Sequence, residues 1–83
     1  MKLTVRYFAS LREALGASET LDVAAEATVG SVRDVLIARG GAHAMALARN
    51  RALRSALNHV LCDEAALVPN EAELAFFPPV TGG

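Results

Sequence analysis

The chain has 83 residues, of which 53% are hydrophobic, and its eight basic and nine acidic side chains give a formal net charge of −1. This length suits one domain around a single core, and the near-neutral charge argues against nucleic acid as a partner. No apolar run approaches the roughly 20 residues that cross a bilayer, and the N-terminus lacks a secretory pattern, so we expect no membrane partner and a cytoplasmic location.

The N-terminal third predicts two paired strands joined by a short helix. Alternation and β-branched or aromatic residues indicate a strand over residues 2–8, with a second strand at 19–23. Between them, Ser10 is the expected N-cap of a helix over 11–15 that Gly16 ends. The two strands are expected to form an antiparallel pair.

The clearest predicted helix covers residues 28–40, with Thr28 as its N-cap and Gly40 at its end. No capping box is expected, because Ser31 stands where a Glu or Gln would be. The predicted apolar stripe consists of Val29, Val32, Val35 and Leu36, and the predicted polar side of Ser31, Arg33, Asp34 and Arg39. Such a helix is expected to lie across a sheet. A weaker helical turn is predicted over 42–48.

The C-terminal half predicts a strand over 54–61, then either a short edge strand or one helical turn over 65–68, and a final strand over 74–77. The fold class that accommodates this order is α+β: a mixed sheet covered by one long helix, with the first and last strands parallel and adjacent. This is the ubiquitin-like β-grasp arrangement, and residues 1–83 are expected to form one such domain.

The segment after the last strand is the candidate functional part of the chain. Pro78 and Pro79 cannot donate to a sheet, so regular structure is expected to stop there, leaving residues 76–83 as a projecting, flexible tail. Gly82 and Gly83 carry no side chain, so the α-carboxylate of Gly83 is easily presented to a narrow active site. The alternative is a frayed Gly-Gly end without function.

The two phenylalanines before the prolines are expected to face opposite ways. Alternation predicts Phe76 in the core and Phe77 exposed as an anchor for a partner, although both side chains in the core is the alternative.

Internal chemistry is not expected. His43 and His59 are isolated in sequence and form no metal motif, and Cys62 is the only cysteine, with acidic neighbours that disfavour a nucleophilic thiolate. No bound metal or cofactor is therefore predicted. The acidic residues near the predicted turns are read as a solvated face, or else as a surface that steers a basic partner: Asp63, Glu64, Glu71 and Glu73.

Several stretches together resemble the small, sulfur-carrying subunits of molybdopterin synthase. They are VRYFASLREALG at 5–16, the predicted helix at 28–40, Asn58, and LAFFPPVTGG at the end of the sequence. The resemblance implies that an E1-like adenylyltransferase uses ATP to adenylate the Gly83 carboxylate, that a sulfur-donating enzyme converts it to a thiocarboxylate, and that the sulfur passes to cyclic pyranopterin monophosphate.

The resemblance also implies the partners. Two small subunits flank a dimer of large subunits in a heterotetramer, and each tail enters one active site. The residues expected to contact the partner are Phe76, Phe77, Pro78, Pro79, Val80 and Thr81, while Gly82 and Gly83 carry the reacting group. Asn58 is expected to be a turn or edge residue. The chain would then donate sulfur without an active site of its own.

Two other functions remain open from the sequence. One is a related sulfur carrier that serves thiamine synthesis or tRNA thiolation, and the other is a β-grasp interaction module whose tail never reacts. The FFPPV stretch favours the molybdopterin synthase interpretation.

Overall fold

The structure is a computed structural model, and it describes residues 1–79. The strands are β1 (Lys2–Tyr7), β2 (Ser18–Asp22), β3 (Arg54–Leu57), β4 (Val60–Cys62) and β5 (Glu73–Phe77). The helices are α1 (Ser10–Leu15), α2 (Val29–Ile37) and α3 (Gly41–Ala46). Within this part of the chain, none of the helices has the length and apolar character that crossing a membrane requires.

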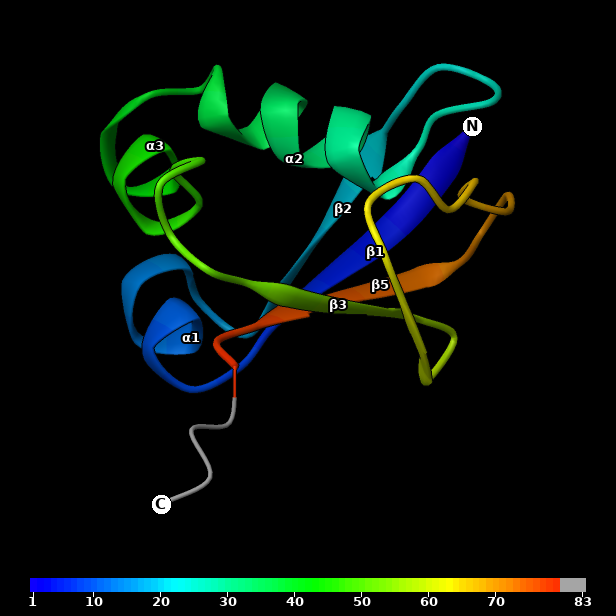
Figure 1. The fold of residues 1–83 in the computed structure, drawn as a ribbon. Helices are drawn as coiled ribbons and strands as arrows, with labels where there is room; N and C mark the ends of the chain where they lie inside the picture. Colours follow the sequence, from blue (N-terminus) through cyan, green and yellow to red (C-terminus); the bar gives the residue numbers. More distant parts are fainter. Residues whose placement is uncertain (80–83) are drawn as a thin grey trace.

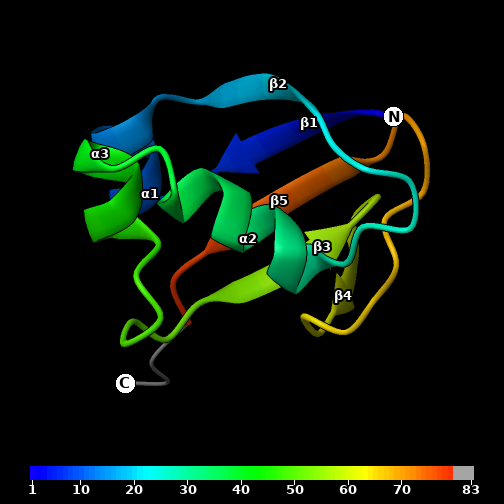
Figure 2. The same cartoon turned by 90° about the horizontal axis from the view of Figure 1, so that it is seen from above.

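All five strands form one mixed sheet in the order β2-β1-β5-β3-β4. β1 and β5 are parallel neighbours, with Tyr7 opposite Phe76, and the other pairs are antiparallel. α2 lies across one face of the sheet, and α1 and α3 lie next to each other at one end of the sheet (Figures 1 and 2). This confirms the predicted α+β ubiquitin-like β-grasp fold and places the last strand at the centre.

The core lies between α2 and the sheet. Its largest fully buried side chains alternate along the strands and recur on one side of α2, as the periods of a strand and a helix require. They are Tyr7, Phe76, Leu3, Leu36, Leu47, Leu74, Val5, Val29 and Val32.

α2 begins where the sequence indicates but is shorter than predicted. Thr28 is its N-cap, and a capping box does form: the Ser31 N–H donates to Thr28 Oγ1 at 3.1 Å, and the Thr28 N–H donates to Ser31 Oγ at 2.9 Å. The serine hydroxyl therefore does what a Glu or Gln side chain usually does. The helix ends at Ile37, and Gly40, with φ of 74°, precedes α3, so the single long helix predicted over 28–40 is not observed.

The predicted strand over 54–61 is instead a hairpin. Asn58 and His59 have φ of 48° and 71°, the left-handed values that a two-residue hairpin turn requires. The Asn58 side chain accepts a hydrogen bond from the Glu73 N–H at 3.0 Å, which ties the turn to β5. β4 thus takes the sheet edge, and residues 65–68 contribute only an isolated bridge between Leu67 and Thr28.

The start of α1 also differs from the prediction. The helix begins at Ser10 and its N-cap is Ala9, with φ of 55°, without a side-chain cap. Gly16 follows the helix with φ of 91°, as its type suggests.

Arg33 was predicted on the polar side of α2 but is buried, at 3% exposure. Its guanidinium donates to the carbonyl oxygens of Leu47 at 2.8 Å, Ala48 at 2.6 Å and Arg51 at 3.0 Å, and to Glu64 at 2.7 Å. It therefore fastens the connection between α3 and β3 to the back of α2. Conversely Val35, predicted on the apolar stripe, is 49% exposed.

Glu64 is not part of a solvated acidic face. It accepts hydrogen bonds from Arg33 and from Arg49, which also pairs with Asp34 at 2.7 Å. Partial burial acts to raise the pKa of Glu64, but the bonds from Arg49 and Arg33 outweigh it and hold the pKa below its usual range. The predicted acidic surface therefore loses one of its four members to a structural network.

A second polar cluster joins the edge strand to α3. Glu19 accepts hydrogen bonds from the Tyr7 hydroxyl at 2.7 Å and from Arg39, and lies 2.8 Å from His43 Nε2. Partial burial acts to raise the pKa of Glu19, but the bonds from His43, Tyr7 and Arg39 lower it overall. Burial and the Glu19 contact raise the pKa of Tyr7. His43 is thus engaged in holding the fold.

Candidate functional site

The root of the C-terminal segment is fixed in the middle of the sheet. β5 pairs with β1 on one side and with β3 on the other, and the Phe8 N–H donates to the Phe76 carbonyl at 3.2 Å. Pro78 and Pro79 follow, both half-buried, and Pro79 is the last described residue. The remaining predicted site residues lie outside the described residues: Val80, Thr81, Gly82 and Gly83. Whatever follows Pro79 thus starts from a rigid point.

Phe76 and Phe77 point to opposite faces of the sheet. Phe76 is 1% exposed and packs in the core under α2, whereas Phe77 is half-buried on the other face. Of the two, only Phe77 presents its ring to a partner when the domain is folded. Phe76 was named among the contact residues, but in the chain alone it supports the strand from beneath.

An apolar platform surrounds Phe77 on the face of the sheet that α2 does not cover. The register sets Ala75 opposite Ala56, and Ala56 opposite Leu61. These two alanines, 8% and 9% exposed, form its floor, while Leu61 is 60% and Phe8 39% exposed around them. We call this surface, Phe8, Ala56, Leu61, Ala75 and Phe77, the open-face platform. Large exposed apolar side chains gathered around a small-residue floor are typical of an interaction surface.

The rim of the platform is charged. The Arg6 guanidinium lies 5.5 Å from the centre of the Phe8 ring and 3.6 Å from Glu73, which is also 3.3 Å from His59 Nε2. Glu73, predicted to be part of a solvated or steering acidic group, is thus paired with Arg6 across β1 and β5. Arg6 therefore positions the Phe8 ring, and the Glu73 carboxylate is paired with Arg6 instead of being free to bind a basic partner.

Sequence reasoning missed Phe8 and Leu61 as surface residues. The signal for Phe8 was present, because strict alternation from Leu3 places it on the face opposite Tyr7. Leu61 was hidden by the missed hairpin, because without the turn at Asn58 it reads as the end of one continuous strand.

The described residues contain no internal catalytic constellation. No three side chains among His, Cys, Asp and Glu within residues 1–79 gather to hold a metal. Cys62 is half-buried, with its Sγ 3.7 Å from Ser55 Oγ, and is not aligned with either histidine. This arrangement offers a hydroxyl contact but no base to activate the thiol.

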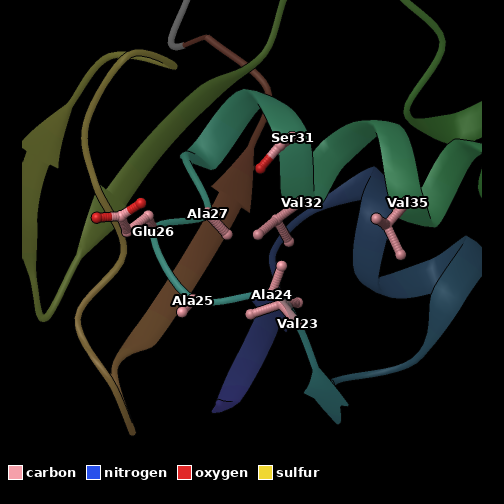
Figure 3. A pocket seen from close by; sticks show the side chains of 8 residues that line it. All are labelled: Val23, Ala24, Ala25, Glu26, Ala27, Ser31, Val32 and Val35. Carbon is pink, nitrogen blue, oxygen red and sulfur yellow. The ribbon is translucent and has the colours of Figure 1, made fainter.

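A shallow hollow of about 280 Å³ between α2 and the connection from β2 is also unsuited to catalysis. Figure 3 shows Val32 and Val35 of α2 facing Val23 and Ala24, while the Glu26 side chain points away. Its one hydroxyl, that of Ser31, already serves the capping box. The connection between β2 and α2, which lines this hollow, lies at the opposite end of the molecule from the end of β5 (Figure 1).

Comparisons with known proteins agree with this geometry. The pattern of the ThiS family matches residues 5–83. A Haemophilus influenzae protein named molybdopterin synthase sulfur carrier subunit is 40% identical over 81 residues, which cover 98% of this chain and 99% of that protein.

Two solved structures share the fold over the full length of both chains. SAMP1 from Haloferax volcanii superposes with a TM-score of 0.79 at 28% identity and 100% coverage of each chain. A chain from the Helicobacter pylori complex of subunits 1 and 2 of molybdopterin-converting factor superposes with a TM-score of 0.69 at 20% identity, again covering 100% of each.

Proposed function

The chain belongs to the ThiS family, and on that premise we propose that it is the sulfur carrier subunit of a molybdopterin synthase. The observation that carries the proposal is the rigid root of the C-terminal segment: β5 is the central strand, an open apolar platform surrounds its last residue, and two prolines follow it. A domain built this way holds the start of its tail still while a partner encloses the tip.

The chemistry belongs to the carboxylate of Gly83. A carboxylate is a poor electrophile, so activation has to come first: a carboxylate oxygen attacks the α-phosphorus of ATP, and pyrophosphate leaves. Hydrosulfide from the sulfur donor then attacks the acyl carbon and forms the carbon–sulfur bond, AMP leaves with the former carboxylate oxygen, and loss of the sulfur-bound proton gives the thiocarboxylate. Gly82 and Gly83 place no β-carbon beside the reacting carbonyl, which allows close approach in a narrow channel.

The proposed partners follow from that sequence of reactions. An E1-like adenylyltransferase supplies the ATP-binding site, a sulfur-donating enzyme supplies the sulfur, and the large synthase subunit receives it for cyclic pyranopterin monophosphate. A complex of subunits 1 and 2 is described for the Helicobacter pylori molybdopterin-converting factor, and one chain of that complex shares this fold. We propose the same pairing here, with two copies of each subunit and with no cofactor bound by this chain. The use of ATP agrees with the expected cytoplasmic location.

Intact-mass spectrometry tests the proposal. The full chain is incubated with an E1-like activator, ATP and a sulfur donor, and its mass is expected to rise by the difference between one sulfur and one oxygen atom. An unchanged mass would favour a non-reactive interaction module. A mass gain without sulfur delivery to the large subunit would favour a carrier for thiamine or tRNA thiolation.

Phe77→Ala is expected to weaken binding to the large subunit by about 2 kcal/mol, the threshold for an anchor residue. Its ring is the part of the open-face platform nearest the tail, so truncation removes apolar contact where the partner has to close around the chain. Calorimetric titration of the large subunit with each variant measures the effect.

Val35→Ala is the matched control, because it removes apolar surface from the exposed side of α2, away from the platform. Its affinity is expected to equal that of the unmodified chain. Equal affinities for Phe77→Ala and Val35→Ala would exclude Phe77 as an anchor.

A further inference from the structure

A second apolar hollow, of about 310 Å³, lies between α1 and α3. Its lining includes Leu11 and Ala14 from α1, Ala42 and Met45 from α3, and Arg51 from the following connection. Leu11 is 3% exposed and forms part of the floor, whereas Met45 is 72% exposed at the rim. An exposed methionine beside an apolar depression can adapt to the shape of an incoming side chain.

The arginine that lines this hollow, Arg51, differs from the arginines that hold the fold together. Four arginines form ion pairs within the described residues: Arg6, Arg33, Arg39 and Arg49. Three others form none within residues 1–79: Arg12, Arg51 and Arg54. Cations without a partner in the domain leave their charge available to another molecule.

These three arginines gather at the end of the sheet where β5 ends. Arg12 lies on α1, which follows the end of β1 and therefore stands beside the end of its parallel neighbour β5 (Figure 1). Arg54 pairs in register with Phe77, and Arg51 lines the hollow itself. The domain thus places free positive charge around the root of its tail although its net charge is −1.

The hollow is connected to the tail root by two backbone hydrogen bonds. The Leu11 N–H donates to the Phe8 carbonyl at 3.2 Å, and the Phe8 N–H donates to the Phe76 carbonyl at 3.2 Å. α1, which forms one wall of the hollow, therefore lies next to the end of β5, and the hollow and the open-face platform lie on two sides of the same root.

We propose that the hollow between α1 and α3 is a second docking surface, which receives an apolar side chain flanked by carboxylates from the large synthase subunit. The apolar floor and Met45 take the side chain, and Arg51, the arginine that lines the hollow, pairs with the carboxylates. This inference rests on the proposed function, because it takes the large subunit as the occupant. Its role is to fix the orientation of the domain about the tail axis, which the platform on one side alone does not fix.

The test is the affinity of purified variants for the large subunit of the same organism, measured by calorimetry at low and at elevated salt. Arg51→Glu is expected to weaken binding about tenfold or more at low salt, and the loss should shrink as salt screens the charges. Met45→Ser is expected to weaken binding severalfold at both salt concentrations, because its contact is apolar. Circular dichroism confirms that each variant is folded.

Lys2→Glu is the matched control. Lys2 is exposed, forms no ion pair within the described part of the chain and lies at the start of β1, the opposite end of the sheet, so its charge reversal is expected to change affinity less than twofold. If the Arg51→Glu and Lys2→Glu variants bind the large subunit with equal affinity while Phe77→Ala binds it more weakly, this proposal is overturned and the proposed function is left intact. No binding by the unmodified chain would overturn both.

Discussion

Deleting Gly83 is expected to abolish thiocarboxylate transfer, with no sulfur delivered above background, while the free energy of unfolding stays within about 0.5 kcal/mol of the unmodified value. The two effects separate because the fold and the chemistry use different parts of the chain. Among residues 1–79, the last member of the buried core is Phe76, and β5 ends at Phe77.

Sulfur transfer is expected to be lost completely because the shortened tail no longer places its terminal carbonyl in the partner's active site. Each residue of an extended chain spans about 3.3 Å, so removing one withdraws the reacting carbonyl by that distance from a fixed root. Misplacing a reacting group by about 1 Å already costs on the order of a hundredfold in rate. A rigid root cannot compensate, since β5 is paired on both sides. Adding one alanine after Gly83 is expected to be as damaging, because it puts a β-carbon and an extra residue in the channel.

Val35→Ala is the control for this experiment, because it alters an exposed side chain outside the tail and the open-face platform without changing the length of the chain. Single-turnover transfer to the large subunit and intact mass before and after transfer measure the outcome. Sulfur transfer at the normal rate by the chain lacking Gly83 would contradict the role assigned to the terminal carboxylate. A shortened chain that also loses its circular dichroism signal would instead place Gly83 in the fold.

Much of the fold follows from residue patterns that need no knowledge of the rest of the molecule. Alternation in β1 and the apolar spacing of Val29, Val32 and Leu36 on α2 give the sheet and the helix that covers it. The parallel pairing of first and last strands follows from placing one helix over so short a chain. The fold class was therefore predictable from local periodicity and chain length.

The errors arose where tertiary contacts outweigh local preference. Arg33 has the side chain of a surface residue, but carbonyls from a distant connection satisfy its donors and allow its burial. Asn58 was expected to be a turn or edge residue and does lie in a turn, but the division of the predicted strand 54–61 into a hairpin was missed, because neither Asn58 nor His59 is glycine and the asparagine conformation is stabilised by Glu73 on β5. The carbonyl groups that Arg33 binds and the Glu73 N–H that Asn58 binds are distant in sequence, so local residue patterns do not indicate these contacts.

The candidate site was predictable only in part for the same reason. The prolines and glycines indicate a tail from the sequence alone, because the backbone properties of these residue types do not depend on their neighbours. The platform around Phe77 depends on which residues the sheet brings together, and Leu61 reaches it only through the hairpin register with Ala56. A surface made from three strands and from Phe8, the residue after β1, cannot be predicted from any one of these segments.

Replacing Arg33 by methionine is expected to destabilise the domain by about 3 kcal/mol or more. The unbranched side chain fills much of the same volume but leaves the buried carbonyl of Leu47, and those of Ala48 and Arg51, without their arginine donor, and each such loss costs roughly 1–3 kcal/mol. Part of that cost is offset because the Ala48 carbonyl keeps its bond from the Arg51 N–H. Against a typical total of about 5–15 kcal/mol, the variant is expected to melt at a much lower temperature.

Urea unfolding followed by circular dichroism measures this loss, since the chain contains no tryptophan. Arg49→Met is the matched control: Arg49 pairs with Glu64 and Asp34 too, but its side chain is 47% exposed against 4% for Arg33. Because an exposed ion pair contributes about 0–1 kcal/mol, the control should lose at most about that much. Losses of equal size would show that charge pairing with Glu64, rather than the satisfied carbonyls, holds α3 and β3 to α2. A loss confined to Arg33→Met would assign that role to the buried hydrogen bonds, which also set the position of the hollow beside the tail.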